Sequence, residues 1–198
     1  MSDNFKILVN EYDEFYQEVY GIESAYDSHS LNAKHIEKMV EYIPSKKSRI
    51  LEYGCANGFN LRFLQREGFI NLTGIDGYIE NNSTKDIKYA KINFAKEEFS
   101  GTYDFIFCRG VLQQGAHTQQ NELIKNSDSD IQKIITVFKK LLDKNGIIWF
   151  NEGPVRDWIK LFGSKNFIVT NISTNPDVYI AIQNHSKVLL AKYARKEK

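Results

Sequence analysis

The sequence is short of several features that define large classes of protein. It contains two cysteines, Cys55 and Cys108, far apart and without the close spacing of metal ligands. We therefore expect neither a disulfide framework nor a zinc site. It has no apolar run of the length that crosses a membrane, and its first residues are acidic, unlike the basic start of a signal peptide. These absences predict a cytoplasmic protein without a membrane partner.

The chain also lacks an excess of charge of either sign. Its 26 basic and 25 acidic residues give a formal net charge of +1. A broad surface for duplex nucleic acid needs clustered Lys and Arg side chains, so nucleic acid is not an expected partner. The 198 residues, of which 42% are hydrophobic, suit one compact domain with its own core.

Helical segments and short apolar runs alternate along the chain. Residues 12–26 have large side chains at mixed helical spacing, and residues 30–43 have apolar side chains on one helical face. These two segments predict two N-terminal helices. The alternation that follows predicts a mostly parallel sheet with helices on both faces, and a turn-like connection near the end predicts an antiparallel hairpin at one edge. The expected strands are 49–54, 72–76, 87–94, 103–110, 146–152, 166–172 and 187–194, and the expected core helices are 58–68, 130–146 and 155–163.

The segment RILEYGCANGFN, residues 49–60, places a loop with two glycines between the first strand and a helix. Ligands of open parallel sheets bind outside the carboxyl ends of the strands. Gly54 and Gly58 would let a ligand approach the backbone there, and the helix N-terminus would favour negative charge. An ordinary tight turn has a similar composition, so the loop alone leaves both interpretations open.

Two carboxylates near this loop favour a ligand. Asp76 ends the second strand 18 positions after Gly58, close to the distance at which an acid reaches ribose hydroxyls. A turn-forming aspartate before Gly77 is the alternative. Glu52 lies inside an apolar strand, where a carboxylate is costly unless it meets a cation. The amino group of a ligand or a salt bridge within the protein would supply that cation.

These residues resemble the motifs of class I S-adenosylmethionine-dependent methyltransferases. EYGCANG, residues 52–58, is similar to the first motif of that family, an acid followed by spaced glycines, with Ala56 in place of the middle glycine. GID, ending at Asp76, resembles the second motif. YDFIFCRGVLQQG, residues 103–115, resembles the fourth-strand motif, and LLDKNGIIWFNE, residues 141–152, resembles the turn into the fifth strand.

The resemblance implies the fold and the reaction. The expected fold is α/β: a Rossmann-like, doubly wound, mostly parallel seven-stranded sheet with an antiparallel C-terminal hairpin and N-terminal lid helices. Residues 1–198 would form a single domain, with residues 1–45 as the lid and 46–198 as the core. The implied cofactor is S-adenosylmethionine, and no metal is implied. The implied cofactor-binding residues are Glu52, Gly54, Cys55, Ala56, Asn57, Gly58, Asp76, Gly77, Tyr78, Asn93, Phe94, Cys108 and Arg109.

The resemblance also implies different roles within this set. The loop 54–58 would wrap the methionine part and the sugar, with Glu52 beneath the cationic methionine end, and Asp76 would bind the ribose. The lid would cover the cofactor with tyrosines, although packing of these helices onto the sheet is an alternative. The remaining implied contacts are Tyr78 and Phe94 on adenine, Asn93 on its amino group, and Cys108 and Arg109 near the sulfur.

Candidate catalytic residues follow the fourth and fifth strands. His117, in a long polar segment, and Glu152, at the end of the fifth strand, are the candidate general bases. An exposed loop histidine and an ion-paired glutamate are the alternatives. Gln113 and Gln114 stand where the family often has histidines, and they cannot accept a proton.

The acceptor is expected to be a small polar metabolite, methylated on oxygen or nitrogen. The chain has no added recognition domain, and the segment after the fourth strand is rich in Gln, Asn and Ser, which suits a sugar or a related compound. Methylation of RNA or protein and a non-catalytic cofactor-binding module are the alternatives. The sequence leaves the oligomeric state open.

Overall fold

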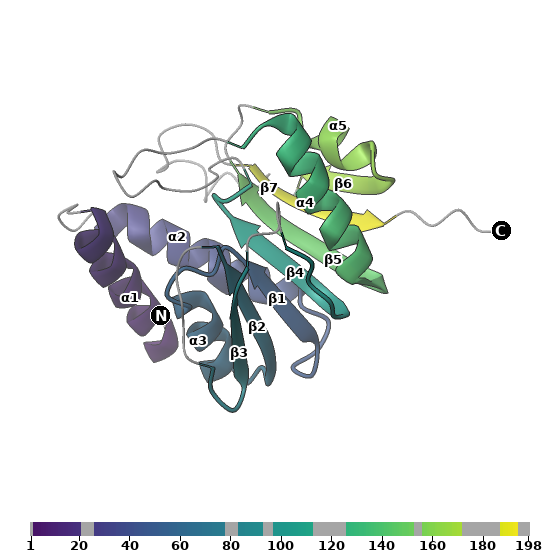
Figure 1. Ribbon diagram of the computed structural model, residues 1–198. Coiled ribbons are helices and arrows are strands. Elements are labelled where there is room, and N and C mark those ends of the chain that lie inside the picture. The colour runs from purple at the N-terminus through teal and green to yellow at the C-terminus, as the bar shows by residue number, and fades with distance from the viewer. Residues whose placement is uncertain are drawn as a thin grey trace.

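Seven strands pair in a single sheet at the centre of this computed structural model (Figure 1). Their order is β3-β2-β1-β4-β5-β7-β6. Strands β1 to β5 are parallel to their neighbours among themselves, whereas β7 runs antiparallel to both β5 and β6. The strands are β1 (Arg49–Tyr53), β2 (Asn71–Asp76), β3 (Ile87–Lys91), β4 (Tyr103–Arg109), β5 (Leu142–Glu152), β6 (Phe167–Asn171) and β7 (Lys187–Tyr193).

Helices cover both faces of the sheet (Figure 1). One face shares a buried apolar cluster with α1, α2 and α3, and the other shares a cluster with α4 and α5. The helices are α1 (Asp3–Tyr20), α2 (Tyr26–Met39), the short 3-10 helix η1 (Val40–Tyr42), α3 (Phe59–Arg66), α4 (Asp128–Leu141) and α5 (Trp158–Gly163). The structure describes residues 2–20, 26–77, 83–92, 97–112, 126–152, 156–171 and 187–193.

The residues of β4 show how one strand serves both layers. Phe105 and Phe107 lie in the cluster under α1, α2 and α3, and Ile106 and Cys108 lie in the cluster under α4 and α5. Successive side chains of a strand point to opposite faces, and all four are fully buried. A continuous apolar run is therefore needed here, as in other parallel sheets covered on both sides.

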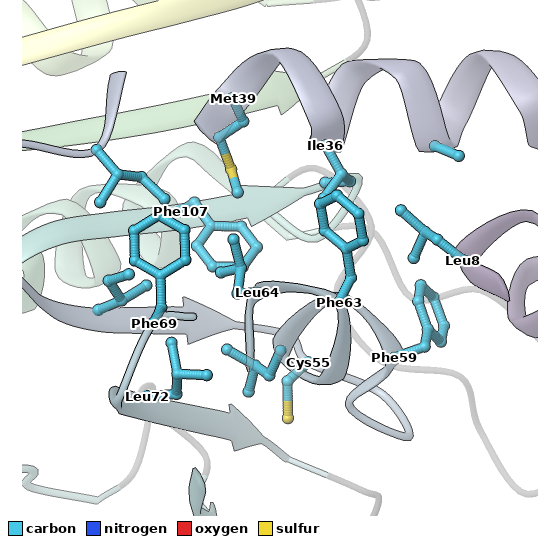
Figure 2. Close-up of a cluster of buried hydrophobic side chains, with 14 of the residues drawn as sticks. Leu8, Ile36, Met39, Cys55, Phe59, Phe63, Leu64, Phe69, Leu72 and Phe107 are labelled. Atoms are coloured by element: carbon cyan, nitrogen blue, oxygen red, sulfur yellow. The ribbon is translucent and has the colours of Figure 1, made fainter. Parts of the chain in front are cut away.

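The N-terminal helices are part of the core. Figure 2 shows Leu8 of α1, and Ile36 and Met39 of α2, on the side of the cluster facing Phe63 of α3 and Phe107 of β4. The side chains of all five are almost completely inaccessible to solvent. Because burial of apolar surface is the main favourable contribution to folding, these helices stabilise the domain as well as cover one end of it.

The structure confirms the predicted class of fold, including the two N-terminal helices and the antiparallel C-terminal hairpin. Some boundaries were wrong. The first helix begins at Asp3, earlier than expected, and α4 ends at Leu141 while β5 begins at Leu142, so Gly146 lies inside the strand. Leu142 pairs with Tyr103 of β4. Sheet pairing therefore overrides the helical periodicity that continues past Leu141.

A side chain at Gly146 would stand 2.7 Å from a methyl carbon of Leu142. This glycine thus serves close packing within β5 and not the end of a helix. Among the described residues, no helix has the combined length and apolarity required to cross a lipid bilayer.

Candidate functional site

The loop between β1 and α3 is built on left-handed backbone conformations. Gly54, Ala56 and Gly58 have φ angles of 77°, 45° and 78°. The N–H groups of Gly54 and Cys55 both donate to the carbonyl oxygen of Ile75, at 2.7 and 3.1 Å. The Gly58 N–H donates to the carbonyl of Cys55 at 2.7 Å. The loop is therefore folded tightly at the carboxyl ends of β1 and β2.

Neighbouring side chains occupy the space that larger residues would need in this loop. A Cβ atom at Gly54 would lie 2.3 Å from a methyl carbon of Val111, and one at Gly58 would lie 2.2 Å from the Tyr89 hydroxyl. Both positions therefore require glycine for packing and for backbone conformation. Gly77 is less constrained, since its Cβ would meet only a backbone oxygen at 3.8 Å.

Asp76, at the end of β2, is tied to the loop. Its Oδ2 accepts a hydrogen bond from the Ala56 N–H at 3.0 Å. The carboxylate thus lies next to the loop and remains partly exposed, where the sequence predicted a ribose site. Asn57 lies in the same turn, and its side-chain oxygen is buried with no hydrogen-bond partner among the described residues.

The cysteine of the loop faces the core. Cys55 is 2% exposed and belongs to the apolar cluster under α1, α2 and α3. Burial raises the pKa of its thiol far above the ordinary value. Cys108, at the end of β4, is fully buried in the opposite cluster, and burial raises the pKa of its thiol as well. Neither thiol is placed to contact a ligand, so only the backbone of these residues could do so.

Glu52 is the most unusual side chain of the site. It is 3% exposed, and its Oε1 accepts a hydrogen bond from the Asn60 side chain at 2.7 Å. Its Oε2 is buried without a partner among the described residues. Burial raises the pKa of Glu52 from 4.5 to about 8, although the Asn60 hydrogen bond opposes this effect. A cation at Oε2 would satisfy this oxygen and favour the ionised carboxylate.

A chain of buried polar groups connects Glu52 to α1. The Tyr12 hydroxyl donates to the side-chain oxygen of Asn60 at 2.9 Å. The guanidinium carbon of Arg109 lies 5.4 Å from the centre of the Tyr12 ring. Burial raises the pKa of Tyr12, so it remains a neutral phenol. The polar chain Arg109–Tyr12–Asn60–Glu52 thus joins β4, α1, α3 and β1.

A second buried polar contact joins α2 to β5. The Asn151 side-chain nitrogen lies 2.9 Å from Nδ1 of His35, and these side chains are 4% and 7% exposed. Burial, and secondarily the charge of Arg109, lower the pKa of His35 from 6.5 to about 4. His35 is therefore neutral at physiological pH. No local pattern predicts this pair, although the position of His35 one turn before the buried Met39 indicates the packed face of α2.

Glu152, a predicted general base, is engaged with the backbone. Its side chain is 1% exposed, and its Oε1 accepts hydrogen bonds from the N–H groups of Val111 and Leu112 at 3.0 and 2.9 Å. These contacts hold the residues that follow β4, including the Val111 side chain that packs against Gly54. The geometry therefore supports a positioning role for Glu152.

The structure brings Glu52, loop 54–58, Asp76 and Arg109 together at the carboxyl ends of β1, β2 and β4. Within the described part of the chain, no cluster of His, Cys, Asp and Glu side chains could hold a metal ion. Several predicted residues lie outside the described ranges: Tyr78, Asn93, Phe94, Gln113, Gln114 and His117.

The family of the chain follows from a match to a family model. A model described as a methyltransferase domain matches residues 24–158. The chain therefore belongs to the methyltransferase domain family. This agrees with the motifs, which predicted a class I S-adenosylmethionine-dependent methyltransferase. Comparison with curated protein sequences gives no significant match.

Solved structures of methyltransferases share the fold. Magnesium protoporphyrin IX methyltransferase from Synechocystis, solved with bound S-adenosylmethionine, is 15% identical with a TM-score of 0.62, covering 98% of this chain and 99% of that chain. The 1,6-didemethyltoxoflavin-N1-methyltransferase from Burkholderia thailandensis is 11% identical with a TM-score of 0.62, and the match covers 96% of this chain and 88% of that chain. A Haloferax volcanii protein, solved in complex with a methyltransferase activator, is 11% identical with a TM-score of 0.61, covering 98% and 99%.

Proposed function

We propose that this methyltransferase uses S-adenosylmethionine as methyl donor and a small polar molecule as acceptor. The observation that carries the proposal is the buried, unsatisfied Oε2 of Glu52 beneath a loop with left-handed glycines. A buried carboxylate oxygen of this kind requires a donor or a cation, and the ammonium group of the cofactor supplies both.

The described residues fit the other parts of the cofactor as well. Gly54 and Gly58 allow close approach to the loop backbone, and Asp76, held beside Ala56, presents a carboxylate for the ribose hydroxyls. When bound, the cofactor supplies a methyl group activated by its sulfonium. The protein then has to hold the acceptor in line with the methyl carbon and keep water out. Tyr12 of α1 contacts Asn60 and Arg109 at this end of the sheet, and Tyr16 stacks on Tyr12. We propose that these two rings help to exclude water.

A general base that removes a proton from the acceptor is hard to find among the described residues. Tyr12 and His35 are buried in neutral forms, and the pKa of His35, near 4, makes it a weak base. Glu152 is engaged by two backbone N–H groups. We therefore propose that Glu152 positions the segment after β4, and that His117 is the remaining candidate base for a hydroxyl acceptor. An amine acceptor would need no base.

Two measurements test the proposed function. Calorimetric titration with S-adenosylmethionine and S-adenosylhomocysteine should show binding, and Asp76→Ala should weaken it by about 10-fold or more. Absence of binding in the unaltered protein would refute the proposal. Release of S-adenosylhomocysteine is then followed with fractionated metabolite pools and with total RNA. Turnover only with RNA would contradict the small-molecule acceptor, and binding without any turnover would indicate a non-catalytic module.

A further inference from the structure

Arg109 differs from the other arginines that the structure describes. Each of the others forms an ion pair with a carboxylate: Arg49 with Asp104 and Asp143, Arg62 and Arg66 with Glu11, and Arg156 with Asp128. For Arg109, no carboxylate of a described residue lies within ion-pairing distance. Its Nε, like that of Arg66, is buried without a hydrogen-bond partner among the described residues. Within the described ranges, Arg109 is therefore a largely buried cation without an anion.

The partners of Arg109 are neutral. Its guanidinium carbon lies 5.4 Å from the centre of the Tyr12 ring, and the phenols of Tyr16 and Tyr12 interact with it electrostatically. The charge of Arg109 contributes to the lowered pKa of His35, which is itself uncharged. Such contacts hold the guanidinium in place, but they only partly replace its hydration. A largely buried guanidinium is stabilised most by a carboxylate that accepts two of its N–H groups side by side.

The polar chain described above has one unsatisfied group at each end. At one end, the Oε2 of Glu52 is an acceptor without a partner, and at the other, the Nε of Arg109 is a donor without a partner, as far as the described residues go. Asn60 and Tyr12 join them through bonds of 2.7 and 2.9 Å. The charge of Arg109 acts on the ionisation of Glu52, but the two residues do not form an ion pair. These two groups are suited to opposite charges of one ligand: Glu52 to a cation and Arg109 to an anion.

We propose that Arg109 is the receptor for a carboxylate group of a ligand bound at the carboxyl ends of β1 and β4, beneath α1. The proposal rests on the proposed function and extends it to the chemistry of what is bound. A singly charged carboxylate suits one guanidinium flanked by two phenols, whereas a phosphate dianion would be repelled by the nearby Glu52 once that residue is ionised. The carboxylate could belong to the methionine end of the cofactor or to the acceptor.

The test compares Arg109→Gln with the unaltered protein, using ligands that differ by one carboxylate. The first pair is S-adenosylhomocysteine and its decarboxylated analogue, and the second pair is benzoate and benzamide added to protein saturated with S-adenosylhomocysteine. Loss of one charge-assisted contact corresponds to about 10- to 100-fold in affinity. Arg109→Lys keeps the charge and should retain part of the preference. Arg49→Gln removes an arginine at the opposite end of β1 and serves as the matched control, with thermal unfolding to show that each variant folds.

Each outcome decides the proposal. If the unaltered protein prefers S-adenosylhomocysteine to its decarboxylated analogue and Arg109→Gln removes that preference, the carboxylate is that of the cofactor. If benzoate is preferred to benzamide and Arg109→Gln removes that preference, the carboxylate is that of the acceptor. Preferences that are absent, or that survive Arg109→Gln, would overturn the proposal. Failure of the unaltered protein to bind either adenosyl compound would instead contradict the proposed function, and the benzoate pair would then be tested on the ligand-free protein.

Discussion

At the scale of single residues, the site is marked by ionisable groups held in their uncharged forms. Burial raises the pKa of Glu52 to about 8 and lowers that of His35 to about 4. Both shifts mean that the ligand-free fold disfavours a charge that the unfolded chain accepts readily. Such groups are common where a protein prepares a place for a ligand.

Glu52 should make the ligand-free protein less stable in mild alkali. Its folded pKa lies above the unfolded value of 4.5, so the stabilising effect of the neutral acid is complete below about pH 4.5 and is lost as the pH rises toward 8. Between about pH 6.5 and 8, the free energy of unfolding should fall by about 1–2 kcal/mol. Glu52→Gln should remove this fall and weaken cofactor binding.

Urea unfolding at several pH values measures this effect. Glu37, on the exposed side of α2, provides the matched control, and Glu37→Gln should behave like the unaltered protein. An equally steep fall in Glu52→Gln would show that another group is responsible.

His35 should have the opposite pH dependence. Its folded pKa lies below the unfolded value, so its contribution to stability is complete above about pH 6.5 and is lost as the pH falls toward 4. The titration of its imidazole resonances by NMR should have a midpoint near pH 4. Arg109→Gln should raise that midpoint, because the Arg109 charge is one cause of the shift. A midpoint near pH 6.5 in the unaltered protein would contradict the buried position.

At the scale of elements, the site depends on how the ends of strands are joined to the loops that follow them. The loop after β1 needs Gly54 and Gly58, and the residues after β4 are held by Glu152 at the end of β5. Val111 connects the two, because its N–H donates to Oε1 of Glu152 and its side chain fills the space beside Gly54. Adjacent parallel strands thus support each other's loops.

Glycine-to-alanine substitutions can separate backbone strain from steric overlap. Gly58→Ala combines a φ of 78° with overlap with Tyr89. It should lower the free energy of unfolding by about 2 kcal/mol or more and weaken cofactor binding. Gly68 has a φ of 88° with nothing nearby, so Gly68→Ala should cost about 1 kcal/mol without affecting binding. Gly163→Ala has neither feature and should be nearly neutral. Equal losses in urea unfolding for Gly58→Ala and Gly68→Ala would rule out the overlap.

Glu152→Gln distinguishes positioning from proton transfer. The amide oxygen of Gln can still accept from Val111 and Leu112, so a positioning role predicts a loss of about 1–2 kcal/mol in stability and a kcat within a few-fold of the original. A general base would lose about 100-fold or more in kcat, and the pH profile of kcat would lose its acidic limb. Steady-state kinetics with an acceptor found in the screen, at several pH values, gives the answer.

At the scale of the whole molecule, the N-terminal helices and the sheet share one apolar cluster. Phe5 and Leu8 of α1 belong to the same cluster as Phe105 and Trp149 of the sheet. Glu11 of α1 also forms ion pairs with two arginines of α3. We therefore propose that residues 1–45 and 46–198 behave as a single folding unit, although the N-terminal part covers the site.

This arrangement predicts one cooperative unfolding transition. Trp149 lies in the cluster that contains α1, and Trp158 lies in the cluster on the opposite face. Each single substitution leaves one tryptophan as a fluorescent reporter. Trp158→Phe retains Trp149 in the cluster that contains α1, and Trp149→Phe retains Trp158 in the opposite cluster. Their unfolding curves in urea should coincide with the loss of helical circular dichroism, after allowance for the stability of each variant. An early helical transition without a change in fluorescence would show that the N-terminal helices unfold separately.

The sequence by itself determined the order of strands and helices, the loop between β1 and α3, and the positions of Glu52 and Asp76. Hydrophobic periodicity and motifs are contained in short continuous segments, so each of these features can be predicted from its own segment. The start of β5 at Leu142 has no local signal, because helical periodicity continues to Gly146 and only pairing with β4 decides the boundary.

Tertiary structure alone decided which polar side chains meet. Tyr12 and Asn60 are 48 positions apart, and His35 and Asn151 are 116 apart, so no local pattern could pair them. The same holds for the backbone contacts of Glu152 and for the lack of an ion-pair partner for Arg109 among the described residues. The physical reason is that burial in a shared core sets both the partner and the charge of each group, and that core exists only once distant segments pack together.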